Sequence, residues 1–200
     1  MPQTLLYSHR VANAASQFAD NIVAVGIAPS ETVIVTGFWR SGTTWLLESV
    51  ARSLGYKTVF EPFHHSIPSY RAAVLGTNGV ADSESFLSLF MPHNPQNDAS
   101  ATKQLRMYLR QSLTSSVPGD WVRTARKEGR WESMRAALRT GVVTKFVRAQ
   151  LLHLQLRKWF GPTILHIRRD PRAILYSFHK MWDEKWWDSL SLERQLLNVA

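Results

Sequence analysis

A glycine-spaced segment holds the residues best suited to binding an anion. It reads TGFWRSGTTW and runs from Thr36 to Trp45. Glycines at this spacing, between a strand and a helix, let backbone N–H groups approach an anion, and the helix start adds partial positive charge. The usual phosphate loop has a lysine after its second glycine, where this sequence has Thr43. We therefore expect an anion other than a γ-phosphate, bound by Arg40, Ser41, Gly42, Thr43, Thr44 and Trp45. The alternative is a tight turn with no ligand.

A second candidate for anion binding lies far along the chain, in IRRDPRAILYS. Arg169 follows a predicted strand, at the edge where open α/β sheets bind ligands. Ser177 comes eight residues later, about two helical turns on, so both side chains can flank one phosphate. The alternative is a structural salt bridge between Arg169 and Asp170, with Ser177 exposed to solvent.

Hydrophobic periodicity predicts the elements that position these residues. Four runs are typical of strands: TVIVTG, KTVFEP, GVVTKFV and PTILHIRRDP. Helices are predicted over Ser8–Val25, over SGTTWLLESVARSLGY, over RAQLLHLQLRKWFG and from Pro171 onward, with a short helix near Ser85–Met91 and one or two solvated helices in 101–140. We expect a single α/β domain over residues 1–200, in which helices flank a mostly parallel sheet.

Composition sets broad limits on function. The 200 residues include no cysteine, which excludes disulfides and thiolate metal sites. No apolar run approaches the roughly 20 residues needed to span a bilayer, so we expect a cytoplasmic protein. The formal net charge is +9, and a basic excess attracts polyanions.

The two candidate segments, in this order, resemble the sulfotransferase family. FWRSGTTWL is similar to its 5′-phosphosulfate loop, and IRRDPRAILYS is similar to its 3′-phosphate motif. The arginine in the loop resembles carbohydrate and bacterial members more than the phenol and steroid enzymes. The resemblance covers residues 31–62 and 142–182. It implies a phosphate-loop fold related to nucleotide kinases, 3′-phosphoadenosine 5′-phosphosulfate as sulfuryl donor, 3′-phosphoadenosine 5′-phosphate as product, and no metal.

The resemblance also implies roles in catalysis. Glu61, in VFEPFHH, is similar to a glutamate that acts as general base in several carbohydrate and bacterial members. It would take the proton from an acceptor hydroxyl or amine, with saccharides among the candidate acceptors and no nucleic acid expected. We expect it next to the loop, at the end of the second strand. His64 and His65 are the next candidates for the base. Arg40 and Lys145 would supply positive charge to the transferring group.

The sequence departs from the phenol and steroid branch in two respects. That branch has a Lys-x-His pair before its 3′ motif, whereas here Lys145 is followed by Val147 at the histidine position. The branch's glycine- and lysine-rich C-terminal element has no counterpart. Because the chain ends at Ala200, soon after the 3′ motif, we expect either a fragment or a minimal form of such an enzyme.

Other functions stay open on the sequence alone. A nucleoside kinase or another phosphate-loop enzyme would need Mg²⁺ and an acid at a strand end, for which Asp170 is available. The net charge also suits a non-catalytic polyanion-binding module. Glu61 could be a structural partner of a nearby arginine. The tryptophans Trp182, Trp186 and Trp187 could pack on the core or line an acceptor site.

Overall fold

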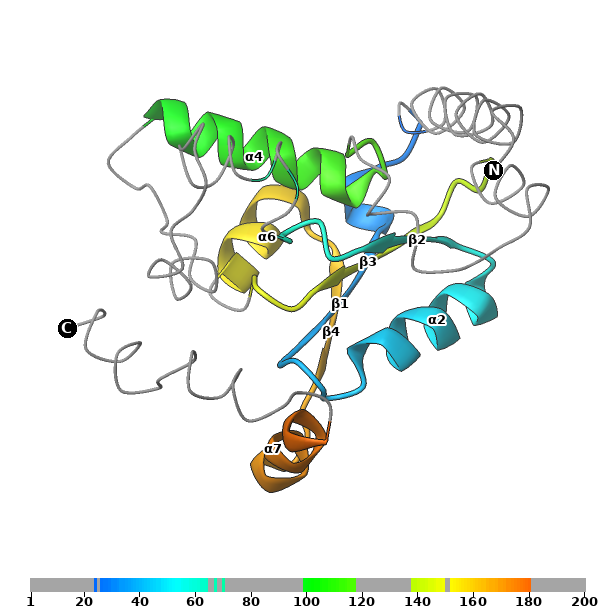
Figure 1. Ribbon diagram of the computed structural model, residues 1–200. Coiled ribbons are helices and arrows are strands. Elements are labelled where there is room, and N and C mark those ends of the chain that lie inside the picture. The colour runs from blue at the N-terminus through cyan, green and yellow to red at the C-terminus, as the bar shows by residue number, and fades with distance from the viewer. Residues whose placement is uncertain are drawn as a thin grey trace, which may run out of the picture.

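The chain folds as an α/β structure, shown in Figure 1 as a computed structural model. The structure describes residues 24, 26–64, 67, 70, 99–117, 138–149 and 152–180. Its sheet has the order β2–β3–β1–β4, and each pairing is parallel. The strands are β1 (Val33–Gly37), β2 (Lys57–Phe60), β3 (Val142–Phe146) and β4 (Thr163–Ile167). The predicted α/β class, with a parallel sheet and helices, is confirmed.

Helices cover both faces of this sheet. The described helical elements are the 3₁₀ turn η1 (Pro29–Glu31) and the α-helices α2 (Thr43–Leu54), α4 (Ala99–Leu113), α6 (His153–Phe160) and α7 (Pro171–His179). In Figure 1, α2 lies on one side of the sheet, and α4 and α6 lie on the other. No described helix is long and apolar enough to cross a membrane.

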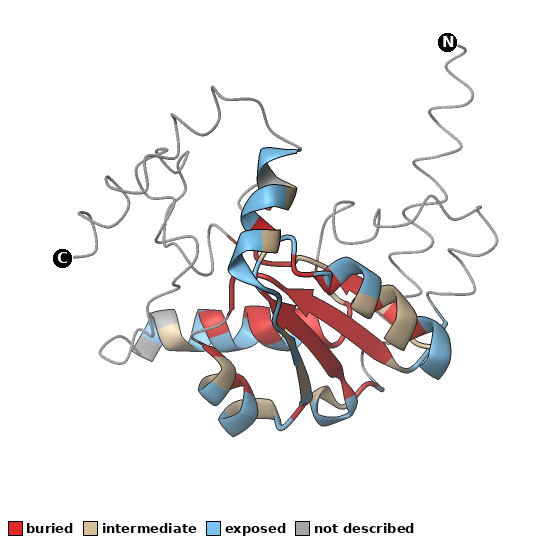
Figure 2. Ribbon diagram, turned by 90° about the horizontal axis from the view of Figure 1, so that it is seen from below, coloured by how far each residue is buried: buried red, intermediate tan, exposed pale blue. Residues whose placement is uncertain are grey.

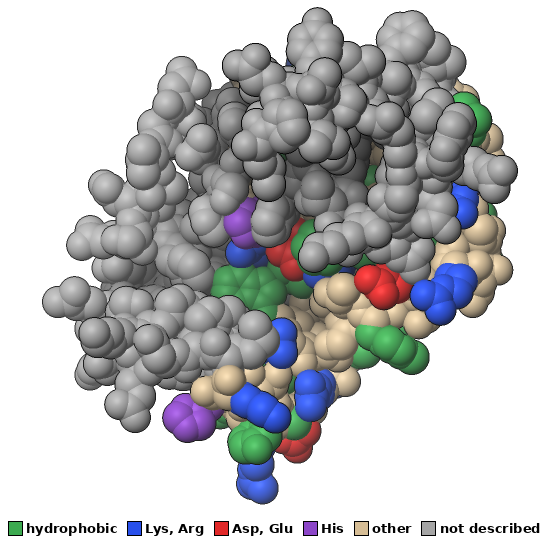
Figure 3. Space-filling view, turned by 45° about the vertical axis from the view of Figure 1, so that its right-hand side comes forward, with side chains coloured by type: hydrophobic (Ala, Val, Ile, Leu, Met, Phe, Trp, Pro, Cys, Tyr) green, Lys and Arg blue, Asp and Glu red, His purple; other side chains and the backbone are tan. Residues whose placement is uncertain are grey.

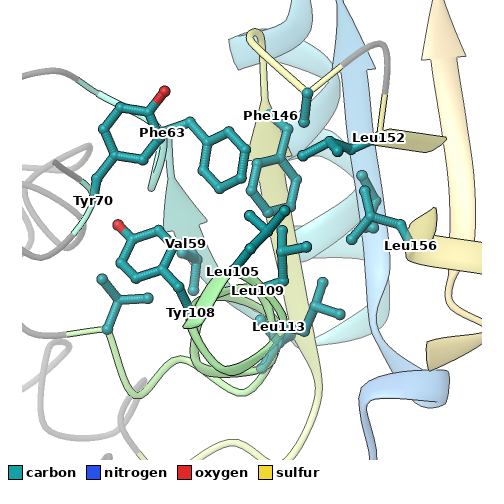
Figure 4. Close-up of a cluster of buried hydrophobic side chains, with 14 of the residues drawn as sticks. Val59, Phe63, Tyr70, Leu105, Tyr108, Leu109, Leu113, Phe146, Leu152 and Leu156 are labelled. Atoms are coloured by element: carbon teal, nitrogen blue, oxygen red, sulfur yellow. The ribbon is translucent and has the colours of Figure 1, made fainter. Parts of the chain in front are cut away.

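The larger of two apolar clusters fills the side of α4 and α6. Four aromatic rings meet there: the Phe63 ring lies 5.0 Å from both Tyr70 and Phe146, and 6.0 Å from Tyr108. Figure 4 shows these rings beside leucines of α4 and of α6 with its N-cap, namely Leu105, Leu109, Leu113, Leu152 and Leu156. The leucine spacing in α4 places one side of that helix in the core, so the predicted solvated helix is solvated on its other side only.

The second cluster joins α2 to the opposite face. Val35 and Val143 of the sheet pack with Leu47 and Ala51 of α2, and all four are buried. Figure 2 shows the inner strands in red as the most buried part of the fold. This packing fixes the start of α2 directly beyond the carboxyl end of β1.

Sequence signals located most helix ends correctly. Gly55 and Gly161 end α2 and α6 in the left-handed conformation, with φ of 67° and 65°, as glycine at these positions predicts. Pro171 opens α7, also as predicted. The predicted helices over Ser8–Val25 and Ser85–Met91 fall almost entirely outside the described residues.

One expectation about the sheet was wrong. Glu61 was expected beside the glycine loop because β2 was placed next to β1, but β3 lies between these two strands. The chain leaves β1, crosses through α2 to β2, and β3 later fills the gap. Any link between Glu61 and the loop must therefore pass through β3.

Candidate functional site

The start of α2 has backbone N–H groups without a side-chain cap. Its N-cap is Gly42, with φ 95°, and no side chain caps this end of the helix. The first turn contains no acidic residue. Since the first N–H groups of a helix have no partner within it, those after Gly42 point beyond the carboxyl edge of the sheet. An anion at this position would satisfy them.

The two sequence segments proposed to bind anions meet at Arg40. Its Nε donates to Ser177 Oγ at 3.0 Å, and Arg169 Nη1 donates to the Arg40 carbonyl oxygen at 2.9 Å. Arg40 itself has a φ of 63°, which is uncommon outside glycine. β4 pairs directly with β1, and this pairing carries Arg169 and Ser177 to the loop. The structure thus brings Arg40, Arg169 and Ser177 together.

Lys145 supplies a second positive charge to the loop from β3. Its ammonium donates to Thr44 Oγ1 at 2.9 Å and lies 2.7 Å from Glu61 Oε1. It also lies 3.6 Å from the centre of the Phe60 ring. The side chain is only 2% exposed. Burial lowers the pKa of Lys145, and the Glu61 carboxylate opposes that shift.

Glu61 stands where β2 ends, with a φ of 43°. A non-glycine residue in this conformation costs about 1–3 kcal/mol, and such residues gather at functional sites. Its carboxylate contacts Lys145 through one oxygen, and its other oxygen lies 3.7 Å from Arg148 Nη1. The side chain remains 15% exposed. It is therefore an ion-pair partner, as one sequence alternative held, and it is also partly exposed to solvent.

Arg148 was not identified from the sequence. It lies just after β3, where Nη1 donates to the Phe63 carbonyl oxygen at 3.3 Å. Its guanidinium carbon stands 4.7 Å from the centre of the Trp39 ring. It therefore contacts the loop after β1 and the turn after β2 at once. The available signal was its place two residues beyond a strand, at the ligand-binding edge.

The remaining loop residues divide into inward and outward groups. The Ser41 hydroxyl donates to the Phe38 carbonyl within the loop, and Ser41 and Thr43 are buried. Trp45 is 69% exposed, so its ring is accessible at the first turn of α2. Figure 3 shows Lys and Arg side chains in blue on this side of the molecule, with acidic side chains in red between them.

Two of the other predicted residues are placed by backbone contacts. His64 N–H donates to the Glu61 carbonyl at 3.0 Å, so His64 lies on the turn that follows the candidate base. Asp170 does not pair with Arg169; its Oδ1 accepts from the N–H of Arg172 at 2.7 Å and caps α7. His65 and the tryptophans Trp182, Trp186 and Trp187 lie outside the described residues.

A histidine contact also lies beside the loop. His153 Nε2 lies 3.1 Å from Thr36 Oγ1, one residue before Gly37. The rings of His153 and His166 are 5.8 Å apart. Burial lowers the pKa of His153, and the nearby His166 adds to the shift.

Comparison with protein families, with curated proteins and with solved structures finds no match to this chain.

Proposed function

We propose that this chain is a sulfotransferase with the phosphate-loop sulfotransferase fold. It moves the sulfuryl group from 3′-phosphoadenosine 5′-phosphosulfate to an acceptor hydroxyl or amine, with saccharides as the first acceptors to test. The observation that carries the proposal is the meeting of Arg40, Ser177 and Arg169 at the uncapped start of α2. Two segments that are far apart in the sequence meet here, which suits a donor with two separate anionic groups.

The donor's two ends have different partners in this proposal. The N–H groups after Gly42, together with Arg40 and Thr44, bind the 5′-phosphosulfate. Arg169 and Ser177 bind the 3′-phosphate. The exposed ring of Trp45 offers a stacking surface for the adenine.

Lys145 replaces the lysine that the loop lacks. The usual loop lysine comes from the helix start, whereas Lys145 reaches Thr44 from the neighbouring strand. A positive charge at this position stabilises charge on the equatorial oxygens of the transferring group. Its attachment to a buried strand fixes the ammonium, which favours catalysis by positioning.

Glu61 serves as the general base. The acceptor oxygen forms a bond to sulfur, and the bond between sulfur and the 5′-phosphate oxygen breaks, so the nucleotide leaves with the electron pair. The acceptor proton passes to the Glu61 carboxylate. Protonation of Glu61 removes the negative partner of Lys145. The ammonium then acts more strongly on the transferring group, at the stage when charge develops there.

The decisive experiment is a thermal-shift comparison of 3′-phosphoadenosine 5′-phosphate with ADP and with ATP plus Mg²⁺. A ligand that binds only the folded state at about 100 times its dissociation constant adds about 2.7 kcal/mol of stability. We expect selective stabilisation by the first nucleotide. Equal or greater stabilisation by ATP with Mg²⁺ would overturn the donor assignment in favour of a kinase-like enzyme.

Transfer itself is tested separately. Labelled donor is incubated with sugars, phenols and amines, and labelled product is counted. Transfer to at least one class is expected. Donor binding without transfer to any of these acceptors would support the proposed nucleotide site and contradict the proposed enzymatic activity.

A further inference from the structure

A cavity of about 480 Å³ opens at the edge of the sheet opposite the glycine loop. Ser30 of η1, just before β1, and Trp159, at the end of α6 before β4, form part of its wall. One side of α4 forms the rest. The loop lies beyond the other ends of the same strands. Five residues of strand span about 16 Å, so the two places are separate.

Three cations of α4 line this cavity. They are Lys103, Arg106 and Arg110, spaced so that one side of the helix carries them all. Each is exposed. The helix Ala99–Leu113 contains no aspartate or glutamate, so it holds three like charges with no internal compensation.

Within the described part of the chain, no acidic side chain forms an ion pair with these three cations. Among the described acidic residues, Glu31 is next to Ser30 in the sequence but does not line the cavity. Like charges three and four residues apart on a helix repel one another. An anion bound among them would relieve this repulsion and accept charge-assisted hydrogen bonds.

Apart from Ser30, the rest of the wall is apolar. Trp159 packs edge-on against Phe160, with ring centres 6.3 Å apart, so its orientation is fixed. Met107, which is 58% exposed, lies between the cations along α4. The cavity volume is within the range of small-molecule sites, roughly 300–1,000 Å³. Positive charges beside a fixed aromatic ring suit a ligand in which an oxyanion is attached to a flat apolar group.

We propose that this cavity is a second ligand site, for a phosphate or sulfate monoester of an aromatic or similarly flat compound. Lys103, Arg106 and Arg110 bind the ester's oxyanion, and Trp159 with Met107 contacts the flat body. The site goes beyond the proposed transfer reaction and shares no described residue with the glycine loop.

Calorimetry on the whole chain tests this site with four probes: phenyl phosphate, phenyl sulfate, inorganic phosphate and phenol. The two esters are expected to bind more tightly than either half alone. Comparing the affinities of phenyl phosphate and phenyl sulfate shows which ester the site prefers. Inorganic phosphate binding as tightly as phenyl phosphate would overturn the role of the ring, and absence of ester binding would overturn the site.

Matched variants locate the binding. Arg106→Gln should weaken phenyl phosphate roughly 10-fold or more, since it removes one charge-assisted hydrogen bond. Arg52→Gln removes the same charge from an exposed position on α2 and should leave binding within about 2-fold, the range of a distant screened charge. Equal losses in the two variants would mean general electrostatic attraction and would overturn the proposal.

A third variant separates this site from the nucleotide loop. Arg40→Ala should leave phenyl phosphate binding intact, because Arg40 lies at the other edge of the sheet. Binding that disappears in Arg40→Ala would place the ester at the loop and overturn the second site. Ester binding that persists while 3′-phosphoadenosine 5′-phosphate fails to bind would support this site and count only against the proposed function.

Discussion

The ammonium of Lys145 lies 2.7 Å from Glu61 Oε1 and 2.9 Å from Thr44 Oγ1. One side chain of β3 thus joins the end of β2 to the start of α2. The buried ammonium has a carboxylate to balance it, and the loop gains a second positive charge in addition to that of Arg40. Stability and proposed catalysis therefore depend on the same pair, and a variant of either residue changes both.

The first prediction separates these two effects with Glu61→Gln, Lys145→Met and the double variant. Breaking a buried pair costs about 3–5 kcal/mol, and the partial exposure of Glu61 favours the lower end for each single variant. The double variant removes both charges and should recover much of that loss. Chemical denaturation of the three variants measures the free energies of unfolding.

Activity should follow a different order. Glu61→Gln keeps size but cannot accept a proton, so turnover should fall about 10²–10⁴-fold with donor affinity nearly unchanged. Lys145→Met should weaken donor binding as well. The double variant should be stable yet inactive. Normal turnover in Glu61→Gln would make Glu61 a structural residue and His64 or His65 the next candidate base.

The second prediction concerns the arginine and serine proposed for the 3′-phosphate. Arg169→Ala should weaken 3′-phosphoadenosine 5′-phosphate by about 1.5–3 kcal/mol, the range for hydrogen bonds to charged groups. The binding free energy of adenosine 5′-phosphate should fall by about 1 kcal/mol or less, a loss expected because Arg169 also donates to the Arg40 carbonyl. Ser177→Ala should show the same preference with a smaller loss. Calorimetry with both nucleotides measures the difference.

Two further variants provide its controls. Arg40→Ala should weaken the binding of both nucleotides, since Arg40 is proposed to bind the 5′ end that they share. Arg172→Ala removes an exposed arginine of α7 and should affect neither. If Arg169→Ala weakens the two nucleotides equally, Arg169 does not bind the 3′-phosphate, and most of the argument for a sulfotransferase is lost.

The third prediction tests the close approach of β1 and β4 at the loop. A Cβ added to Gly37 would lie 2.6 Å from the Ile167 carbonyl oxygen and 2.7 Å from Ile167 Cγ2. Because the oxygen is backbone, relief requires β4 to move away from β1. Gly37→Ala should cost about 1–3 kcal/mol, as overpacking does, and should abolish stabilisation by the nucleotide. Thermal melting with and without 3′-phosphoadenosine 5′-phosphate measures both effects.

Gly161→Ala is the matched control. Gly161 has φ 65°, and an added Cβ would meet nothing within 4 Å. The variant should lose about 1–2 kcal/mol from the left-handed backbone alone and keep its response to the nucleotide. A Gly37→Ala protein that binds the nucleotide normally would show that the spacing of β1 and β4 does not shape the loop.

Local patterns predicted the elements well because their causes are local. β-branched runs formed the strands, and Gly55, Gly161 and Pro171 marked helix ends through their own backbone preferences. The loop residues and Arg169 were predicted because glycine spacing and strand ends have direct chemical meaning.

The links between distant segments required the sheet order. Arg40 contacts Ser177 across 137 residues only because β4 pairs with β1. The position of β3 between β1 and β2 depends on how distant segments pack together, and no local sequence pattern specifies it. This strand order places Lys145 beside Glu61 and Arg148 beside Trp39. These contacts therefore could not be derived from the spacing of residues in the sequence.

The last prediction concerns pH and His153. Its folded pKa is lowered from 6.5, by burial and by His166, so the unfolded chain takes up a proton first as pH falls. Stability is therefore fully present above about pH 6.5 and is lost as pH falls through the lower folded pKa. His153→Gln can still hydrogen-bond with Thr36 but cannot titrate, so the variant should lose less stability than the wild type between about pH 7.5 and 5.5. His179→Gln removes an exposed histidine of α7 and should retain the wild-type slope. Melting temperatures measured across this pH range test the prediction. If the dependence of melting temperature on pH is unchanged in His153→Gln, acid destabilises the fold through another group.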